Sequence, residues 1–140
     1  MIVLDTSVVL AFMDRGDANH EPVREWMQEQ DQELATTPLV IAELDHLILR
    51  QGGASAARAL RKDLDEGAYL VEWWPAAMHE TIALAERHRS MDLGLTDASL
   101  LALAAHLQST RIATLDERHF RALKPQSNSD AFTLLPADAG

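Results

Sequence analysis

Five short stretches of the chain have the hydrophobic pattern of strands. The first of them, at residues 2–4, and the fourth, at 111–115, are largely apolar at successive positions rather than at alternate ones. This pattern is typical of a parallel sheet that is covered by helices on both faces. The five predicted strands are residues 2–4, 34–37, 69–73, 111–115 and 131–135.

Segments with helical periodicity lie between these strands. We predict helices at residues 7–13, 22–30, 38–50, 54–66, 76–89 and 97–108, and a short helical turn at 117–123. Strands that alternate with helical crossovers indicate a doubly wound α/β fold. In such folds, ligands bind outside the carboxyl ends of the strands.

Composition limits the class of protein. With 140 residues, of which 47% are hydrophobic, the chain fits one globular domain over residues 1–140, whose last residues, 136–140, we expect to fray. It has no cysteine, which excludes disulfides and thiolate metal sites and favours a cytoplasmic location. The apolar start lacks a basic leader and contains Asp5, and no apolar run approaches the ~20 residues of a membrane span, so we expect neither a signal peptide nor membrane insertion.

Charge is unevenly distributed along the chain. The net charge is −10, but acids are concentrated between Asp14 and Glu33. Two basic groups stand apart from them, and their members are Arg50, Arg58, Arg61 and Lys62 in the first, and Arg118, His119, Arg121 and Lys124 in the second. Each group can be either a nucleic-acid contact or an ordinary solvated helix face.

Four carboxylates occupy positions that the predicted fold brings to one edge of the sheet. Asp5 ends the first strand and Asp116 ends the fourth. Asp97 begins a helix that is apolar on all sides, and Glu43 lies in the helix that follows the second strand. Two unit charges ~4 Å apart repel by about 4 kcal/mol at an effective dielectric constant near 20. A shared cation would relieve this repulsion, and oxygen ligands favour Mg²⁺, with Mn²⁺ as a substitute.

Each of these acids also has an ordinary structural explanation. Asp5 suits a turn that leads into a helix, and Asp116 suits the N-cap of the next helix. Asp97 fits the first helical position after a Thr96 cap. Glu43 belongs to a narrow polar stripe on its helix, which solvent alone would explain. It is the convergence of all four that favours a metal site.

Four ordered motifs are similar to those of one known family. They are IVLDTS at the N-terminus, TTPLVIAEL with Glu43, LTDASLLALA with Asp97, and IATLDERHF with Asp116. In this order and spacing they resemble the PIN-domain ribonucleases, and most closely toxins of the VapC type. The resemblance implies a three-layer α/β/α fold with a parallel five-stranded sheet in the order 3-2-1-4-5. It implies a Mg²⁺-dependent endoribonuclease in which Asp5, Glu43, Asp97 and Asp116 are the catalytic, metal-binding acids.

The resemblance extends to neighbouring residues and to partners. Thr6 and Thr114 match positions that suit hydroxyls orienting the metal ligands, and Asp92 is a candidate auxiliary acid. Candidate contacts to RNA phosphates are Arg50, Arg58, Arg61, Lys62, Arg118 and Arg121. The implied partners are RNA, a VapB-like antitoxin and a second copy of the chain.

Other functions fit less well. A haloacid-dehalogenase-type phosphatase needs an aspartate where Ser7 stands, and a receiver domain needs one at the end of the third strand, where the chain has Trp73 and Trp74. The remaining alternative is a PIN-like module that binds RNA or protein with little or no nuclease activity. Mg²⁺-dependent cleavage of RNA distinguishes it from an enzyme.

Overall fold

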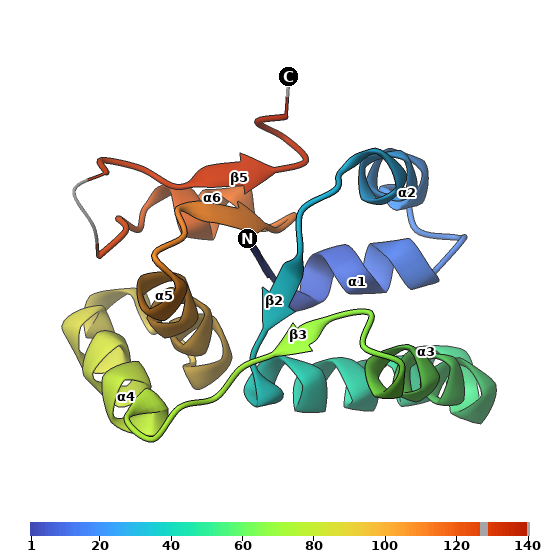
Figure 1. Cartoon of the computed structure of the whole chain (residues 1–140), viewed down its shortest axis with the longest axis horizontal. Coiled ribbons are helices and arrows are strands. Elements are labelled where there is room, and N and C mark those ends of the chain that lie inside the picture. The colour runs from blue at the N-terminus through green and yellow to red at the C-terminus, as the bar shows by residue number, and fades with distance from the viewer. Residues whose placement is uncertain (127–128, 140) are drawn as a thin grey trace.

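The central element of the fold is a parallel five-stranded sheet in the order β3-β2-β1-β4-β5 (Figure 1). The computed structural model describes residues 1–126 and 129–139. The strands are β1 (Ile2–Leu4), β2 (Leu34–Thr36), β3 (Leu70–Val71), β4 (Arg111–Ala113) and β5 (Thr133–Leu135). The expected strand order and parallel pairing are therefore confirmed.

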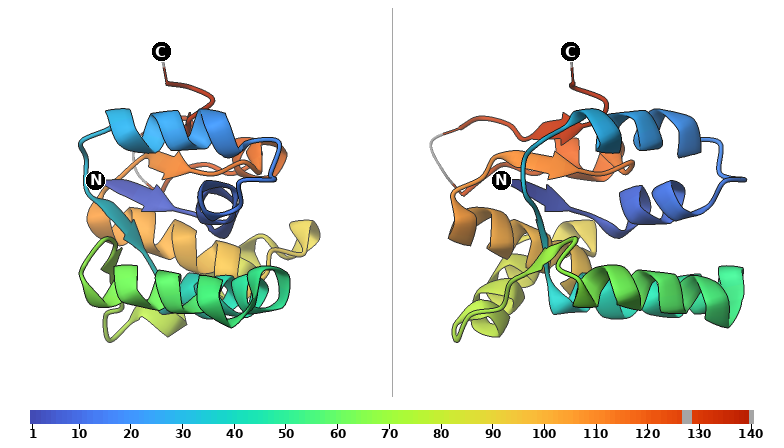
Figure 2. Two further views of the ribbon diagram at one scale, coloured as in Figure 1. Left: turned by 90° about the vertical axis from the view of Figure 1, so that its right-hand side faces the viewer. Right: turned by 45° about the vertical axis from the view of Figure 1, so that its right-hand side comes forward.

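Helices cover both faces of this sheet. They are α1 (Thr6–Met13), α2 (His20–Glu29), α3 (Pro38–Asp65), α4 (Ala77–Arg87), α5 (Leu95–Leu107) and α6 (Glu117–Arg121), with a 3₁₀ turn η1 (Arg89–Met91). Figure 2 shows α2 over one face and α5 under the other. The fold thus has the expected three layers.

Successive side chains of the central strand supply two separate cores. Val3 packs with α4, α5 and α6, whereas its neighbours Ile2 and Leu4 pack with α1, α2 and α3. Because side chains alternate between the faces of a strand, three apolar residues in a row serve both cores. The pattern that predicted a doubly covered sheet has this physical origin.

Helix α5 is the centre of one core. Every residue from Ala98 to Ala104 is buried. A helix with apolar residues on all sides must be surrounded by protein, and α5 lies between the sheet and α4 (Figure 1). Its central position, expected from the sequence, is confirmed.

Helix α3 joins two predicted helices. The segments expected at 38–50 and 54–66 form one element with a break at Gly53, whose φ of 80° and ψ of −175° are not helical. A residue without Cβ tolerates this backbone. At the other end, Thr37 caps the helix by accepting a hydrogen bond from Val40 N (3.3 Å), and Pro38 occupies the first turn, both as predicted.

Strands β2, β3 and β4 end earlier than predicted, and β3 and β5 begin later. Thr37 leaves the sheet to cap α3, and Thr114 turns its hydroxyl toward Asp5 and Asp116. Capping therefore replaces pairing at Thr37, whereas Thr114 N still donates to Leu135 O (2.9 Å).

Residues 136–139 form a turn that is fixed to the body of the domain. Asp138 accepts hydrogen bonds from Leu134 N (2.8 Å) and from Arg121 Nη2 (2.7 Å). We expected residues 136–140 to fray, and the contacts of Asp138 weigh against fraying of this segment. Gly140 lies outside the described residues. Within the described part of the chain, none of the helices has both the length and the apolar character needed to span a membrane.

Candidate active site

The four acids singled out by the sequence line one open cleft at the carboxyl edge of the sheet. The cleft has a volume of about 410 Å³. Its lining comprises Asp5, Thr6, Ser7, Leu10, Glu43, Leu47, Gly94, Leu95, Thr96, Asp97 and Asp116. Three helices and two strand ends meet here, so the geometry brings together residues that lie up to 111 positions apart (116 − 5).

Asp5 is held at the end of β1 by a dense set of donors. Its Oδ1 accepts a hydrogen bond from Thr6 N (2.8 Å), and its Oδ2 accepts from Ser7 Oγ (2.8 Å) and Thr114 Oγ1 (2.8 Å). Asp5 N donates in turn to Ala113 O (2.9 Å), which extends the pairing of β1 with β4 by one residue. The carboxylate is consequently buried and fixed in orientation.

Thr114 connects the two strand-end acids. Its hydroxyl donates to Asp5 Oδ2 and accepts from Asp116 N (2.9 Å). Thr6 is buried beside the cleft, but its hydroxyl has no hydrogen-bond partner among the described residues. Asp92 is exposed at the end of η1 and does not belong to the cleft lining.

Ser7 is a contact that sequence reasoning missed. Besides donating to Asp5, its Oγ accepts a hydrogen bond from Leu115 N (2.9 Å), so it links α1 to the chain that leaves β4. The signal was the DTS triplet: a small hydroxyl two residues after a strand-ending aspartate. On its own, such a serine is too common at helix starts to be singled out.

Asp97 and Glu43 come from two helices that are fastened together near their starts. Thr37 Oγ1 lies 2.8 Å from Ser99 Oγ, which joins the cap of α3 to the first turns of α5. Asp97 is the third residue of α5, whose cap is Gly94; the expected Thr96 cap is wrong, because Thr96 already lies within the helix. Asp97 is partly buried, whereas Glu43, which α3 brings to the same cleft, is exposed.

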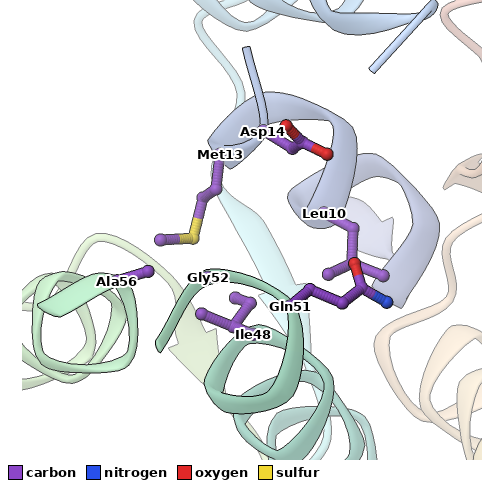
Figure 3. A pocket seen from close by; sticks show the side chains of 7 residues that line it. All are labelled: Leu10, Met13, Asp14, Ile48, Gln51, Gly52 and Ala56. Atoms are coloured by element: carbon purple, nitrogen blue, oxygen red, sulfur yellow. The ribbon is translucent and has the colours of Figure 1, made fainter. Parts of the chain in front are cut away.

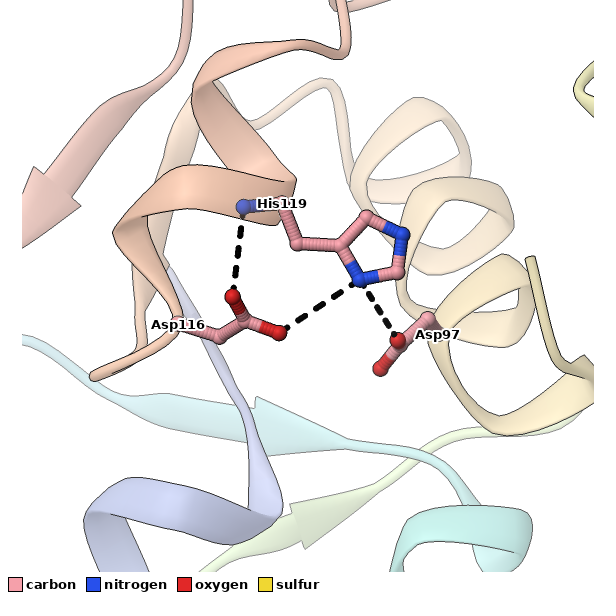
Figure 4. A group of neighbouring side chains, drawn as sticks. All are labelled: Asp97, Asp116 and His119. Carbon is pink, nitrogen blue, oxygen red and sulfur yellow. Dashed lines mark hydrogen bonds and ion pairs between the residues drawn. The ribbon is translucent and has the colours of Figure 1, made fainter. Parts of the chain in front are cut away.

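His119 also belongs to this site. Its Nδ1 lies 3.3 Å from Asp97 Oδ2 and 3.4 Å from Asp116 Oδ2 (Figure 4). The sequence places His119 only in a basic surface group, because the histidines of the chain lack the mutual spacing of a histidine metal site. The available signal was Asp116 and His119 three positions apart in one helical turn, a spacing that puts both side chains on the same face.

Burial and mutual repulsion make this group of acids electrostatically unfavourable. Desolvation raises the pKa of Asp5, although the hydrogen bonds from Thr114, Ser7 and Thr6 oppose the shift. Desolvation, with the nearby charge of Asp5, raises the pKa of Asp97 to about 6. Carboxylates whose ionisation is opposed by burial and by one another, and that line a common cleft, fit a divalent cation.

Comparison with known proteins identifies the family. Residues 2–124 match the family model of the PIN domain. The chain belongs to the PIN-domain family. Ribonuclease VapC26 of Mycobacterium tuberculosis is 32% identical to this PIN domain over 136 residues, which span 96% of the chain and 100% of the relative.

Solved structures have the same fold. The VapC20 toxin of Mycobacterium tuberculosis, described as cleaving the sarcin-ricin loop, is 22% identical with a TM-score of 0.74, covering 80% of this PIN domain and 87% of that chain. A toxin–antitoxin complex from Klebsiella pneumoniae is 14% identical with a TM-score of 0.64, covering 88% and 92%. At these identities the likeness is one of fold.

The candidate phosphate-binding residues of this PIN domain differ in their availability. Arg61 is paired with Asp45 (2.8 Å), Lys62 with Glu66 (3.2 Å), and Arg121 with both Glu117 (2.9 Å) and Asp138 (2.7 Å). In contrast, Arg50, Arg58 and Arg118 are exposed and make no ion pair with any residue that the structure describes. Arg118 lines a hollow beside Asp116 and His119.

We predict unequal effects for two Thr→Val substitutions in this PIN domain. Thr114→Val removes a hydroxyl that serves both Asp5 and Asp116, so it should lower the free energy of unfolding by about 1–3 kcal/mol. Thr81→Val is the control, because the Thr81 hydroxyl is buried with no partner among the described residues and its loss should cost little. Urea unfolding measures both, and equal losses would contradict the role given to Thr114.

Proposed function

We propose that this PIN domain is a metal-dependent endoribonuclease that acts as the toxin of a toxin–antitoxin pair. The observation that carries the proposal is the convergence of Asp5, Glu43, Asp97 and Asp116 on one open cleft of a PIN domain. The relative named Ribonuclease VapC26, with which the chain aligns over almost its whole length, supports the same activity. The absence of cysteine from the sequence favours the cytoplasm as its location.

The roles of the acids follow from their surroundings. Asp5, Asp97 and Asp116 would hold a divalent ion, Mg²⁺ or in its place Mn²⁺. The Thr114 hydroxyl would keep Asp5 and Asp116 in orientation, and the Thr6 backbone N–H would do so for Asp5. Bound there, such an ion supplies Lewis acidity toward a water and a phosphate oxygen. Glu43 is exposed in the same cleft, where it can accept a proton from the attacking water or help to hold a second ion.

Substrate binding needs cations, since the cleft itself repels phosphate. Arg118, unpaired with any described residue and adjacent to Asp116, is the best-placed contact for a phosphate next to the scissile bond. Arg50 and Arg58 are the available cations on α3, whereas Arg61, Lys62 and Arg121 must first leave their acidic partners. The products of cleavage would carry 5′-phosphate and 3′-hydroxyl ends.

A basic, partly apolar segment of an antitoxin would suit the surface next to the cleft. A hollow of about 120 Å³ lies between α1 and α3, where Figure 3 shows Met13, Ile48 and Ala56 around it. Leu10 lines both this hollow and the acidic cleft, so one bound segment can reach from apolar side chains to the carboxylates. An arginine at its end would bind the acids in place of the ion.

Met13→Glu should therefore weaken binding of the antitoxin made from the same operon. A negative charge in the apolar hollow has no partner there, and we expect roughly a tenfold loss or more, on the scale of a single interface hot spot. Val71→Glu is the control, because Val71 is 41% exposed on β3 and lines neither the hollow nor the acidic cleft. Calorimetric titration measures both affinities, and equal weakening by the two variants would exclude this hollow as the binding surface.

We also propose that the protein pairs with a second copy of itself. Met78 and Ile82 stand one turn apart on α4 and are 41% and 48% exposed, and Trp73 nearby in sequence is 37% exposed. Large apolar side chains grouped in this way are typical of contact surfaces. Light scattering should give about twice the monomer mass of 15.5 kDa, and a monomer at all working concentrations would refute the pairing.

The decisive prediction for the activity concerns the acids. Purified protein should cleave total RNA with Mg²⁺ and stop when EDTA removes the ion. Asp5→Asn or Asp97→Asn should reduce the rate by at least the roughly 10–100-fold that changes around a metal site cause. Asp31→Asn is the control, because Asp31 is exposed before β2, at the opposite edge of the sheet.

Two outcomes separate the enzyme from its alternative. Cleavage that survives Asp5→Asn would come from a contaminating nuclease or another site. RNA binding without cleavage by any variant would instead favour the PIN-like binding module that the sequence left open.

A further inference from the structure

We propose that His119 is a nitrogen ligand of the divalent ion and makes the site prefer Mn²⁺ to Mg²⁺. The inference rests on the proposed function, because it assumes that Asp97 and Asp116 hold a metal. It departs from the sequence-based expectation of a site built from oxygen alone. Three features of the described residues support it: the spacing of the donor atoms, the way each is held, and the chemistry of the imidazole.

The two distances from the imidazole nitrogen to the carboxylate oxygens are those of ligands around one ion. Asp97, Asp116 and His119 each offer one atom, and all three atoms lie within 4.8 Å of one another. Ligand atoms about 2.0–2.1 Å from a common ion lie roughly 3.0–3.4 Å apart, for octahedral and tetrahedral angles respectively. His119 Nδ1 lies 3.3 Å from one carboxylate oxygen and 3.4 Å from the other, within this range.

The same distances are long for direct hydrogen bonds. A charge-assisted N–H···O bond measures about 2.7–2.9 Å, and Nδ1 carries only one hydrogen to share between two acids. The nitrogen therefore lies between Asp97 and Asp116 without a short bond to either (Figure 4). This placement suits three donors that converge on a common centre better than an imidazolium paired with one carboxylate.

Local structure holds both partners of α6 in this arrangement. Asp116 caps the helix, and its Oδ1 accepts a hydrogen bond from His119 N (3.2 Å), which leaves Oδ2 facing the ring. The ring of His119 lies 6.0 Å from that of Phe120, which is completely buried. A capped turn and a buried neighbour thus hold the imidazole beside Asp97 and Asp116, a preorganisation that metal ligands require.

The identity of the donor atom determines which ion the site binds more tightly. Imidazole nitrogen is a ligand of transition-metal ions, among which Mn²⁺ binds it most weakly, but it is a still poorer ligand for the hard ion Mg²⁺, which prefers carboxylate and water oxygens. The nitrogen should therefore raise the affinity for Mn²⁺ while leaving that for Mg²⁺ almost unchanged. Mutation of a residue that only hydrogen-bonds to a metal ligand already costs roughly 10–100-fold in metal affinity. Loss of this direct ligand should therefore weaken Mn²⁺ binding by at least roughly tenfold.

The test uses Mn²⁺ as the probe, and Mg²⁺ as its competitor, with protein that carries no histidine tag. Pulsed electron paramagnetic resonance detects ¹⁴N next to bound Mn²⁺, and loss of the free-ion signal gives the affinity. We expect nitrogen coupling in the wild type, its loss in His119→Gln together with a tenfold or greater loss of Mn²⁺ affinity, and little change in Mg²⁺ affinity measured by competition. His79→Gln, at an exposed position of α4, is the control and should retain the coupling.

The possible failures are distinguishable. Mn²⁺ that binds the wild type without nitrogen coupling, or with coupling that persists in His119→Gln, would overturn the role of His119 and leave the metal-dependent nuclease standing. A wild type that binds neither ion would remove the metal site, and with it both proposals. Circular dichroism checks the fold of His119→Gln, and if that variant unfolds, the wild-type spectrum with His119→Asn decides the question.

Discussion

The parallel pairing of β1 with β4 is the constraint on which the site depends. It sets the ends of the two strands side by side, so that Asp5 N still bonds to Ala113 O and the Thr114 hydroxyl serves both Asp5 and Asp116. Both strands are interior strands of the sheet and are covered on each face. Burial of the side chains on both faces therefore fixes the register of this pair. A slip of one residue would move every apolar side chain to the wrong core and separate the two acids.

Burial of negative charge is the consequence of this arrangement, and it links stability to function. The environment of Asp5 and Asp97 raises their pKa values, because burial disfavours their charged forms. The same arrangement produces a cleft that attracts cations. The same negative field favours two of the proposed partners, a divalent ion and a basic segment of an antitoxin, and it opposes the third, RNA, whose phosphates would need Arg118. Unfavourable local interactions of this kind are common at functional sites, where the fold serves chemistry rather than maximal stability.

Much of the fold could be predicted, because its signals are local or depend on simple periodicity. Consecutive apolar residues at Ile2–Leu4 predicted a doubly covered strand, and the apolar sequence of α5 predicted a central helix. The errors lie at boundaries. Thr96 was expected to cap a helix that in fact begins at Leu95, and two predicted helices join as α3. At such points competing local preferences differ by little, and tertiary packing selects among them.

The sequence by itself determined which residues end the strands and begin the helices, and hence that Asp5, Glu43, Asp97 and Asp116 share one edge of the domain. Only the tertiary structure decided which side chains meet there. His119 and Ser7 entered the site, while Arg61 and Arg121 were drawn into ion pairs elsewhere. The reason is physical: hydrophobic periodicity orients a residue within its own element, but contacts of a few ångströms depend on how separate elements pack and which rotamers that packing permits.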